Sequence, residues 1–260
     1  LALVRVVQQD GEALLLALAE RRLNALLAGD ASFEHPYLTP RRHVGRVCYV
    51  VFWGNRGLCG AYNQLLLRHL EGLVRAEARP CSVIVCGRWG RDVLAGTDLP
   101  VRQIFSDLSD TPTMAEALEI AEELKNLYRT GEADEIHLVY QHFDSVLHQT
   151  PTHRQLLPAA PEADAPAANN NYLFVPDAQT VLDNVLELYL NNTVYAVMLE
   201  ARVGEHAARM TAMTAATDST AELIEDLNLE FNRARQAAIT TEISEIVGGS
   251  AALKKSDKSD

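Results

Sequence analysis

The hydrophobic positions in the last quarter of the chain follow a helical period over a long segment. Between Gly204 and Gly248 there is neither proline nor glycine, and no proline follows Pro176. Steps of three and four residues connect a narrow seam of apolar, small and a few polar positions: Leu199, Val203, His206, Met210, Met213, Thr217, Thr220, Ile224, Leu227, Phe231, Ala234 and Ala238. At 1.5 Å per residue, the segment predicts a helix roughly 60 Å long. So narrow a seam is typical of a coiled coil with one partner helix, and a buried helix of a large α-domain is the alternative.

A second helical pattern lies at the beginning of the chain. Residues 1–29 are rich in Leu, Ala, Glu and Arg, and the pattern ends at Gly29. Leucines on one face make this segment the expected antiparallel partner of the C-terminal helix. Because the chain starts with Leu1 rather than Met, we expect this N-terminal coiled-coil helix to be truncated.

Between the two helical patterns, short apolar runs alternate with amphipathic segments. Runs rich in Val, Ile and aromatic residues predict strands at 46–53, 81–87, 101–105 and 135–143. Helical periods predict helices at 63–78 and 113–128. Strands that alternate with helices indicate an α/β, Rossmann-like globular domain with a parallel-rich sheet. We place this domain at residues 44–176.

The end of the predicted domain has a different composition. Residues 150–171 are rich in Pro, Ala, Asn and acidic residues, which predicts a mobile loop. A short strand is expected at 172–176. Asp177 is the expected N-cap of the C-terminal coiled-coil helix, which we place at 177–253, and residues 254–260 are expected to form a tail.

Composition and charge narrow the classes of function. The formal net charge of -12 argues against a general binder of nucleic acid or of anionic membranes. Apolar runs fall short of the roughly 20 residues that span a bilayer, and the first residues do not resemble a secretory signal. Hydrophobic residues make up 48% and charged residues 22% of the chain, which is ordinary for a soluble protein.

The four cysteines do not form a recognisable ligand or redox motif. Cys48, Cys59, Cys81 and Cys86 lack the CxxC spacing of metal sites. A redox pair of Cys81 with Cys86 is an alternative, although an extended strand would hold the two thiols too far apart. We therefore expect free thiols in a reducing cytoplasm.

One glycine-rich turn joins a predicted strand to a predicted helix, at residues 54–60 (GNRGLCG). Backbone amides in such a turn could bind a phosphate, but the lysine and hydroxyl of a P-loop are missing. We therefore expect Gly57, Leu58, Cys59 and Gly60 to form a structural turn. The alternative is that Cys59 is exposed at the helix start and serves as a nucleophile, since a helix dipole lowers the pKa of a thiol.

Two further groups of polar residues remain open to interpretation. His137, His142 and His148 lie on one strand and its exit, without the spacing of a metal site. The C-terminal helix carries an acidic series that fits either a solvated face or contact with a basic partner: Asp218, Glu222, Glu225, Asp226 and Glu230. We predict no catalytic, cofactor-binding or metal-binding residue.

Several motifs together resemble the gamma subunit of the F-type, proton-translocating ATP synthase. The segment NRGLCGAYN is similar to that family's strand–helix turn, with Ala61 where a glycine is usual. The C-terminal segment matches nearly throughout, including the signature positions Ile239, Thr240, Glu242, Glu245 and Gly249. Ser250 replaces the usual alanine, and the basic N-terminal segment of the family is missing. The resemblance extends over nearly the whole chain, so it is more specific than a likeness of fold.

The resemblance implies a role as the central rotor stalk, which transmits rotation of the membrane proton-driven ring to the catalytic hexamer. The chain would be a non-catalytic subunit without cofactor, nucleic acid or direct small-molecule substrate. The implied partners are the alpha and beta subunits, the epsilon subunit and the membrane rotor ring, at the cytoplasmic face of a bacterial plasma membrane. The implied contacts with the catalytic subunits are made by Arg235, Gln236, Glu242, Ile243, Ile246 and Val247. The alternatives are a coiled-coil adaptor unrelated to ATP synthesis and a stand-alone Rossmann-like enzyme.

Overall fold

The structure is a computed structural model that describes residues 23, 35–41, 43–94, 97–159, 175 and 177–256. The chain divides into two compact units, Leu1–Ala212 and Met213–Asp260. Apart from Leu23, the predicted N-terminal helix lies outside the described residues, as do residues 160–171 of the predicted loop. The strand predicted at 172–176 also lies outside them, apart from Val175.

The first unit is built on a five-stranded sheet with the order β3-β2-β1-β4-β5. The strands are β1 (Val47–Phe52), β2 (Cys81–Cys86), β3 (Val101–Phe105), β4 (Glu135–Ser145) and β5 (His148–Leu157). β1 pairs in parallel with β2 and β4, and β2 pairs in parallel with β3. β5 is antiparallel to β4. The predicted parallel-rich sheet of an α/β fold is therefore confirmed.

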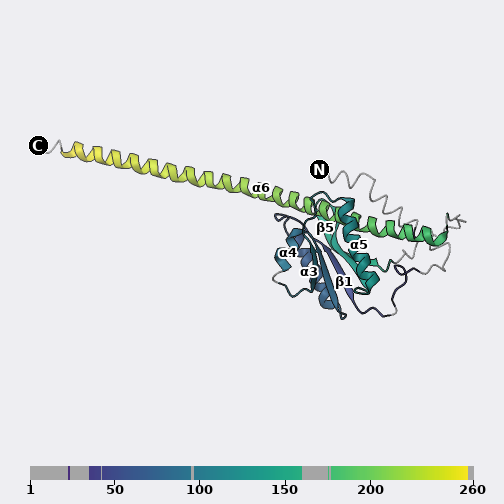
Figure 1. The fold of residues 1–260 in the computed structure, drawn as a ribbon. Coiled ribbons are helices and arrows are strands. Elements are labelled where there is room, and N and C mark those ends of the chain that lie inside the picture. Colours follow the sequence, from purple (N-terminus) through teal and green to yellow (C-terminus); the bar gives the residue numbers. More distant parts are fainter. Residues whose placement is uncertain are drawn as a thin grey trace. The chain divides into compact units, whose positions relative to one another are not determined.

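Helices cover both faces of the sheet (Figure 1). They are α3 (Tyr62–Ala76), α4 (Arg88–Leu94), α5 (Met114–Thr130) and α6 (Ala178–Ser256). The side chains of β1 contribute to two hydrophobic cores, one on each face of the sheet. Cys48, Val50 and Phe52 belong to the core that contains α5 and the beginning of α6. Val47 and Val51 belong to the core that contains α3. This burial on both faces explains why the apolar run of β1 is continuous rather than alternating.

The beginning of α6 is packed against the sheet. Asp177 caps it as predicted, because its carboxylate accepts a hydrogen bond from the amide of Thr180 at 2.9 Å. The buried side chains recur at helical spacing along one face: Leu182, Leu186, Tyr189, Leu190, Val194, Val197, Met198 and Ala201. Leu23 is buried in the same core.

The strand β5 corrects the prediction of a loop that begins at residue 150. Residues 150–157 pair with β4, although residues 150–155 are mostly polar and include Pro151. Among the described strands β5 lies at the edge of the sheet and pairs only with β4, and a proline is tolerated in such an edge position. The polar composition fits the same position, since an edge strand is only partly covered. The short helix α4 was also not predicted.

The second unit consists of the rest of α6. Residues 213–256 are helical, which corresponds to about 66 Å at 1.5 Å per residue. The helix continues through Gly248 and three residues into the predicted tail. Within the described structure every residue from Met213 to Gly248 is exposed, including Ile224 and Phe231 of the predicted seam. No described helix is long and apolar enough to cross a membrane.

Candidate functional site: the glycine-rich turn and its contacts with α6

The glycine-rich turn lies where α/β folds commonly bind ligands. It follows the C-terminal end of β1, and β1 lies between its parallel neighbours β2 and β4. The chain continues from β1 through α3 to β2 on one side, and reaches β4 on the other side later. Such a reversal of strand order opens a crevice at the carboxyl ends of the strands. The topology alone is therefore compatible with a binding site at residues 54–60.

The turn uses positive φ angles at two positions. They are Gly60, with φ of 58°, and Leu58, with φ of 61°. A left-handed backbone is uncommon for a residue other than glycine, so Leu58 is held in a strained conformation. Its side chain is 75% exposed, so burial of leucine does not offset that strain. The predicted structural role of the turn is consistent with this geometry, although the strain falls on Leu58 rather than on Gly57.

The backbone amides of the turn are occupied by a carboxylate of the same chain. Glu205 of α6 accepts hydrogen bonds from the amides of Asn55 and Arg56, both at 3.2 Å. A β-carbon on Gly54 would lie 3.0 Å from the Glu205 Cδ, so glycine permits this close approach. Two consecutive amides that converge on one anion are the arrangement that binds phosphate in other folds. Here Glu205 fills that position.

Two arginines neutralise the Glu205 carboxylate, whose side chain is 3% exposed. Arg202 donates from Nη1 to Oε2 at 2.7 Å, and its own side chain is 6% exposed. Arg209 donates to Oε1 from one turn further along the helix. Burial raises the pKa of Glu205, but the hydrogen bond from Arg209 and the charge of Arg202 outweigh burial and lower the pKa below its usual value. The carboxylate is therefore ionised at neutral pH.

Arg209 also binds the turn directly. Its Nε donates to the carbonyl of Gly57 and its Nη2 to the carbonyl of Arg56, both at 3.2 Å. These two carbonyls immediately precede Leu58, so the guanidinium stabilises the backbone where its conformation is strained. We call the whole set the turn clamp: Glu205, Arg202, Arg209 and the backbone of residues 55–57.

The geometry around Cys59 contradicts its interpretation as an exposed nucleophile. Its side chain is buried, with 4% of the residue exposed. Burial raises the pKa of the thiol, against a smaller lowering by Arg209. The side chain of Asn63 donates from Nδ2 to the Cys59 Sγ at 3.4 Å, and its Oδ1 accepts from the backbone amide of Gly54 at 3.1 Å. Cys59 is therefore a packed thiol that helps to order the turn.

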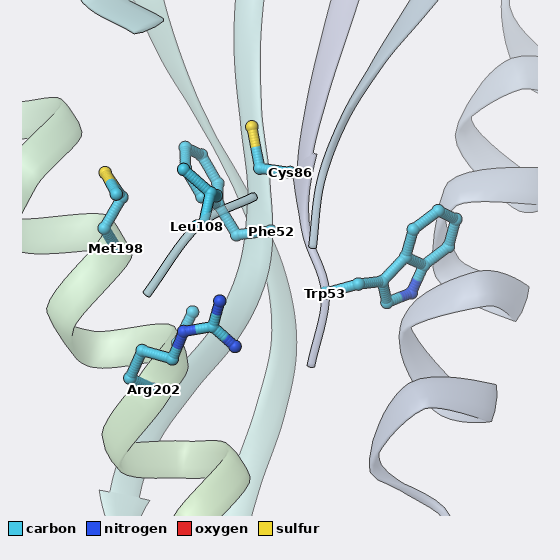
Figure 2. A pocket seen from close by; sticks show the side chains of 7 residues that line it. Phe52, Trp53, Cys86, Leu108, Met198 and Arg202 are labelled. Carbon is cyan, nitrogen blue, oxygen red and sulfur yellow. The ribbon is translucent and has the colours of Figure 1, made fainter. Parts of the chain in front are cut away.

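A small cavity lies beside Arg202 (Figure 2). It has a volume of about 10 Å³ and is lined by Phe52, Trp53, Cys86, Leu108, Met198, Ala201 and Arg202. Figure 2 shows Met198 and Arg202 on α6 facing Phe52 and Leu108. A volume of this size accommodates about one water molecule and excludes a nucleotide. The cavity is thus a packing defect beside the buried guanidinium of Arg202.

The remaining polar candidates do not converge on one site. His142 pairs with Glu200 of α6, and His148 is exposed near Asp144. His137 lies on the other face of β4, 3.6 Å from Glu135. Within the described part of the chain, no group of three His, Cys, Asp or Glu residues could hold a metal ion.

The four thiols are free in the described structure. Cys81 and Cys86 lie at the two ends of β2, so the extended strand separates them as expected.

The six predicted contact residues lie on the helix of the second unit. Arg235, Gln236, Glu242, Ile243, Ile246 and Val247 are all exposed. At 100° per residue these positions fall within a stripe about 140° wide. Within the described structure, Arg235 has no ion-pair partner. The acidic series from Asp218 to Glu230 is likewise exposed.

Comparison with known proteins defines the family. Residues 11–253 match the family model described as ATP synthase. An ATP synthase gamma chain of Desulfitobacterium hafniense is 43% identical over 231 residues, which cover 88% of this chain and 81% of that protein. The gamma chain of Symbiobacterium thermophilum is 39% identical over 236 residues, covering 90% and 82%.

Solved structures show the same fold. A chain in the Euglena gracilis mitochondrial ATP synthase structure described as OSCP/F1/c-ring has a TM-score of 0.63 and 17% identity, and the match covers 97% of this chain and 91% of that chain. A chain in the Tetrahymena thermophila structure described as central stalk/cring has a TM-score of 0.56 and 20% identity, covering 83% and 98%. The fold is therefore that of central-stalk subunits of rotary ATP synthases. The chain belongs to the ATP synthase gamma chain family, and this excludes the interpretation as an unrelated coiled-coil adaptor.

The residues that hold the turn were not identified from the sequence. The turn itself was singled out, but Glu205 and Arg209 were not. The available signal was their spacing: Arg202, Glu205 and Arg209 stand at i, i+3 and i+7, which places three charges on one helix face. Charged residues beside the apolar seam of a helix can form a buried ion cluster or lie on the solvent-exposed side. The sequence does not distinguish these two arrangements, whereas the structure does.

Proposed function

We propose that the chain is the central rotor shaft of a rotary ATP synthase. In this role, α6 turns inside a ring of alternating alpha and beta subunits and transmits the rotation of a proton-driven membrane ring. The observation that carries the proposal is the match of residues 11–253 to the family, combined with a helix whose described residues from Met213 to Gly248 are all exposed. An exposed helix with regularly spaced apolar residues is suited to burial by other chains.

The stripe from Arg235 to Val247 is the proposed contact with the catalytic subunits. A shaft without rotational symmetry touches each subunit of the ring differently. Only such differential contacts can shift a conformational equilibrium, because a ligand that binds all states equally shifts none of them. Rotation of the stripe would therefore change the nucleotide affinity of each catalytic subunit in turn.

The chain itself is proposed to be non-catalytic. The amides of the glycine-rich turn, which could have bound a phosphate, are already bound by Glu205. We expect that the isolated chain does not bind ATP at micromolar concentration in isothermal titration calorimetry. Saturable binding that is lost in Gly60→Val would contradict this and would revive the interpretation as a Rossmann-like enzyme.

The proposed partners are the alpha, beta and epsilon subunits and the membrane rotor ring, at the cytoplasmic face of a bacterial plasma membrane. Attachment to the membrane would be indirect, through the complex. The test is co-purification of the tagged chain from membranes. We expect alpha and beta subunits at a fixed stoichiometry, with ATP hydrolysis by the recovered complex. Recovery of the tagged chain without them would overturn the proposal.

A further inference from the structure

The turn clamp lies close to the end of the packed part of α6. Apolar contacts continue along the helix to Ala207, which is 2% exposed. From Met213 to Gly248 every described residue is exposed. Glu205 and Arg209 thus connect α6 to the α/β domain at the last turns of the helix before the exposed segment begins.

The clamp adds a dense set of directional contacts to a part of α6 that is held mainly by apolar packing. One earlier polar contact is Glu200, which accepts from the amide of Phe143 at 3.0 Å. Apolar packing resists both separation and rotation of α6, because turning the helix would expose the side chains that its apolar face buries. The clamp adds bonds whose strength depends on their angles. Hydrogen bonds weaken steeply when their angles change. Glu205 binds two consecutive amides of the turn, and Arg209 binds two consecutive carbonyls. Rotation of α6 would break all four bonds together.

Charge and burial strengthen this resistance. The Glu205 side chain is 3% exposed and that of Arg202 is 6% exposed, so salt screens their interaction little. Charge-assisted hydrogen bonds are about twice as strong as neutral ones. The tyrosine of α3 adds a further polar contact nearby, since the Tyr62 hydroxyl donates to the carbonyl of Ala201 at 2.7 Å.

We infer that the turn clamp is the rotational lock between α6 and the α/β domain, and that Glu205 is its positioning residue. This inference rests on the proposed function as a rotor. If the clamp opens under load, α6 turns while the domain lags behind. ATP hydrolysis then continues, but fewer protons are transported for each ATP that is hydrolysed.

The first test replaces the central carboxylate by an isosteric amide. Glu205→Gln keeps the volume but removes the charge, and its NH₂ group opposes the N–H donors of the turn. The variant complex is placed in membrane vesicles, and ATP hydrolysis and ATP-driven proton uptake are measured together. We expect hydrolysis within about twofold of the parent and proton uptake per ATP lowered at least about twofold, because a buried charged partner is lost. Glu222→Gln, in an exposed position of the same helix, should match the parent in both.

The second test restores the lock by a covalent bond. A β-carbon on Gly60 would lie 3.8 Å from the Cβ of Ala212, which is within the range of disulfides. Gly60→Cys and Ala212→Cys are introduced together with Glu205→Gln, with Cys59→Ser in every protein compared. Oxidation should return the coupling ratio to that of the parent, and dithiothreitol should lower it again. Because a disulfide also stabilises the fold, the same cysteine pair is measured with Glu205 intact, where both redox states should keep the coupling ratio of the parent. A ratio in the Glu205→Gln protein that stays low after oxidation would refute the lock.

The outcomes separate this inference from the proposed function. If the parent chain does not assemble with alpha and beta subunits, or its vesicles show no ATP-driven uptake, the proposed function fails. If the parent is coupled but Glu205→Gln has the coupling ratio of Glu222→Gln, the lock is refuted. If Glu205→Gln does not assemble, Arg209→Ala is measured instead, since it removes both carbonyl bonds. A parent-like ratio in Arg209→Ala also refutes the lock.

Discussion

The close approach of α6 to the turn depends on the absence of a side chain at Gly54. A β-carbon there would lie 3.0 Å from the Glu205 Cδ and 3.1 Å from the Asn63 Oδ1. We expect Gly54→Ala to lower the free energy of unfolding by about 1–3 kcal/mol, because the neighbours are buried and have to shift. Urea unfolding of the isolated chain measures the effect.

Gly57→Ala is the matched control for this prediction. A β-carbon on Gly57 meets nothing within 4 Å, so its effect should stay within about 0.5 kcal/mol. Equal destabilisation by the two substitutions would show that the turn requires glycine for flexibility rather than for close approach.

Three histidines lie close together in the first unit, and we expect them to make its stability sensitive to mild acid. The rings of His69 and His137 lie 5.6 and 6.0 Å from the ring of His153. The Nε2 of His69 and the Nδ1 of His137 are buried without a hydrogen-bond partner. Burial lowers the pKa of both residues, and the charge of His153 lowers each further. Other charges nearby are Glu135, which raises the pKa of His137, and Arg79, which lowers it.

The sign of the pH effect follows from these lowered pKa values. Near pH 6.5 and below, the unfolded chain binds more protons at these histidines than the folded chain, so stability rises with pH. The contribution is present above about pH 6.5, the ordinary pKa of histidine, and is lost as the pH falls from there through the lowered pKa values of the folded chain. We expect a lower urea midpoint at about pH 5.5 than at about pH 7.5, and a smaller difference in His69→Gln. The exposed His43→Gln should leave the difference unchanged, and an unchanged difference in His69→Gln would refute the role of the cluster.

At the scale of elements, the helices and strands that were predicted correctly are those whose apolar residues follow the pattern of burial in the structure. β1 is a continuous apolar run that is buried on both faces, and β2 and β4 each contain a shorter apolar run, at residues 83–85 and 138–140. α5 has an amphipathic period with a capping box at Thr113 and Glu116. β5 was not recognised because residues 148–155 are mostly polar and include Pro151, although β5 forms a hairpin with β4 directly before it in the chain. The clamp at Glu205 was missed for a different reason: its partners in the turn are about 150 residues away in sequence.

The helix of the second unit is expected to be only marginally stable in the isolated chain. Its described residues from Met213 to Gly248 bury no side chain, and most helical stability in proteins comes from packing. Side chains of Thr217, Thr220, Thr240, Thr241 and Ser244 also bond to the carbonyl four residues earlier. Such bonds slightly destabilise a helix.

Hydrogen exchange tests this expectation residue by residue. Amides between Thr217 and Val247 should exchange fast in the isolated chain, whereas those of Val50 and Val85, which are 0% exposed in the central strands, should exchange slowly. In the assembled complex the helix should become protected. Strong protection of both regions in the isolated chain would show that another part of the chain already covers the helix.

At the scale of the whole molecule, the acidic and basic residues of the exposed helix lie in separate segments, which matters for the proposed rotation. Along the exposed helix, five carboxylates from Asp218 to Glu230 precede Arg233 and Arg235. A cation that follows an acidic series is positioned to meet a carboxylate on another chain. The proposed rotor role requires such contacts to differ between rotary angles, since a contact present at every angle adds nothing to the differences between catalytic subunits.

Arg235→Ala is the test of this contact in the assembled complex. If the Arg235 guanidinium meets a catalytic-subunit carboxylate at one rotary angle, removing it should cost about 1.5–3 kcal/mol at that angle and little at others. We therefore expect a steady-state ATP turnover at least several-fold below that of the parent, with assembly intact. Glu222→Gln should change turnover much less, because its carboxylate is exposed and outside the proposed stripe. Turnover is compared at matched subunit stoichiometry. Parent-like turnover in Arg235→Ala together with impaired turnover in Glu222→Gln would place the contact on the acidic series rather than on the proposed stripe.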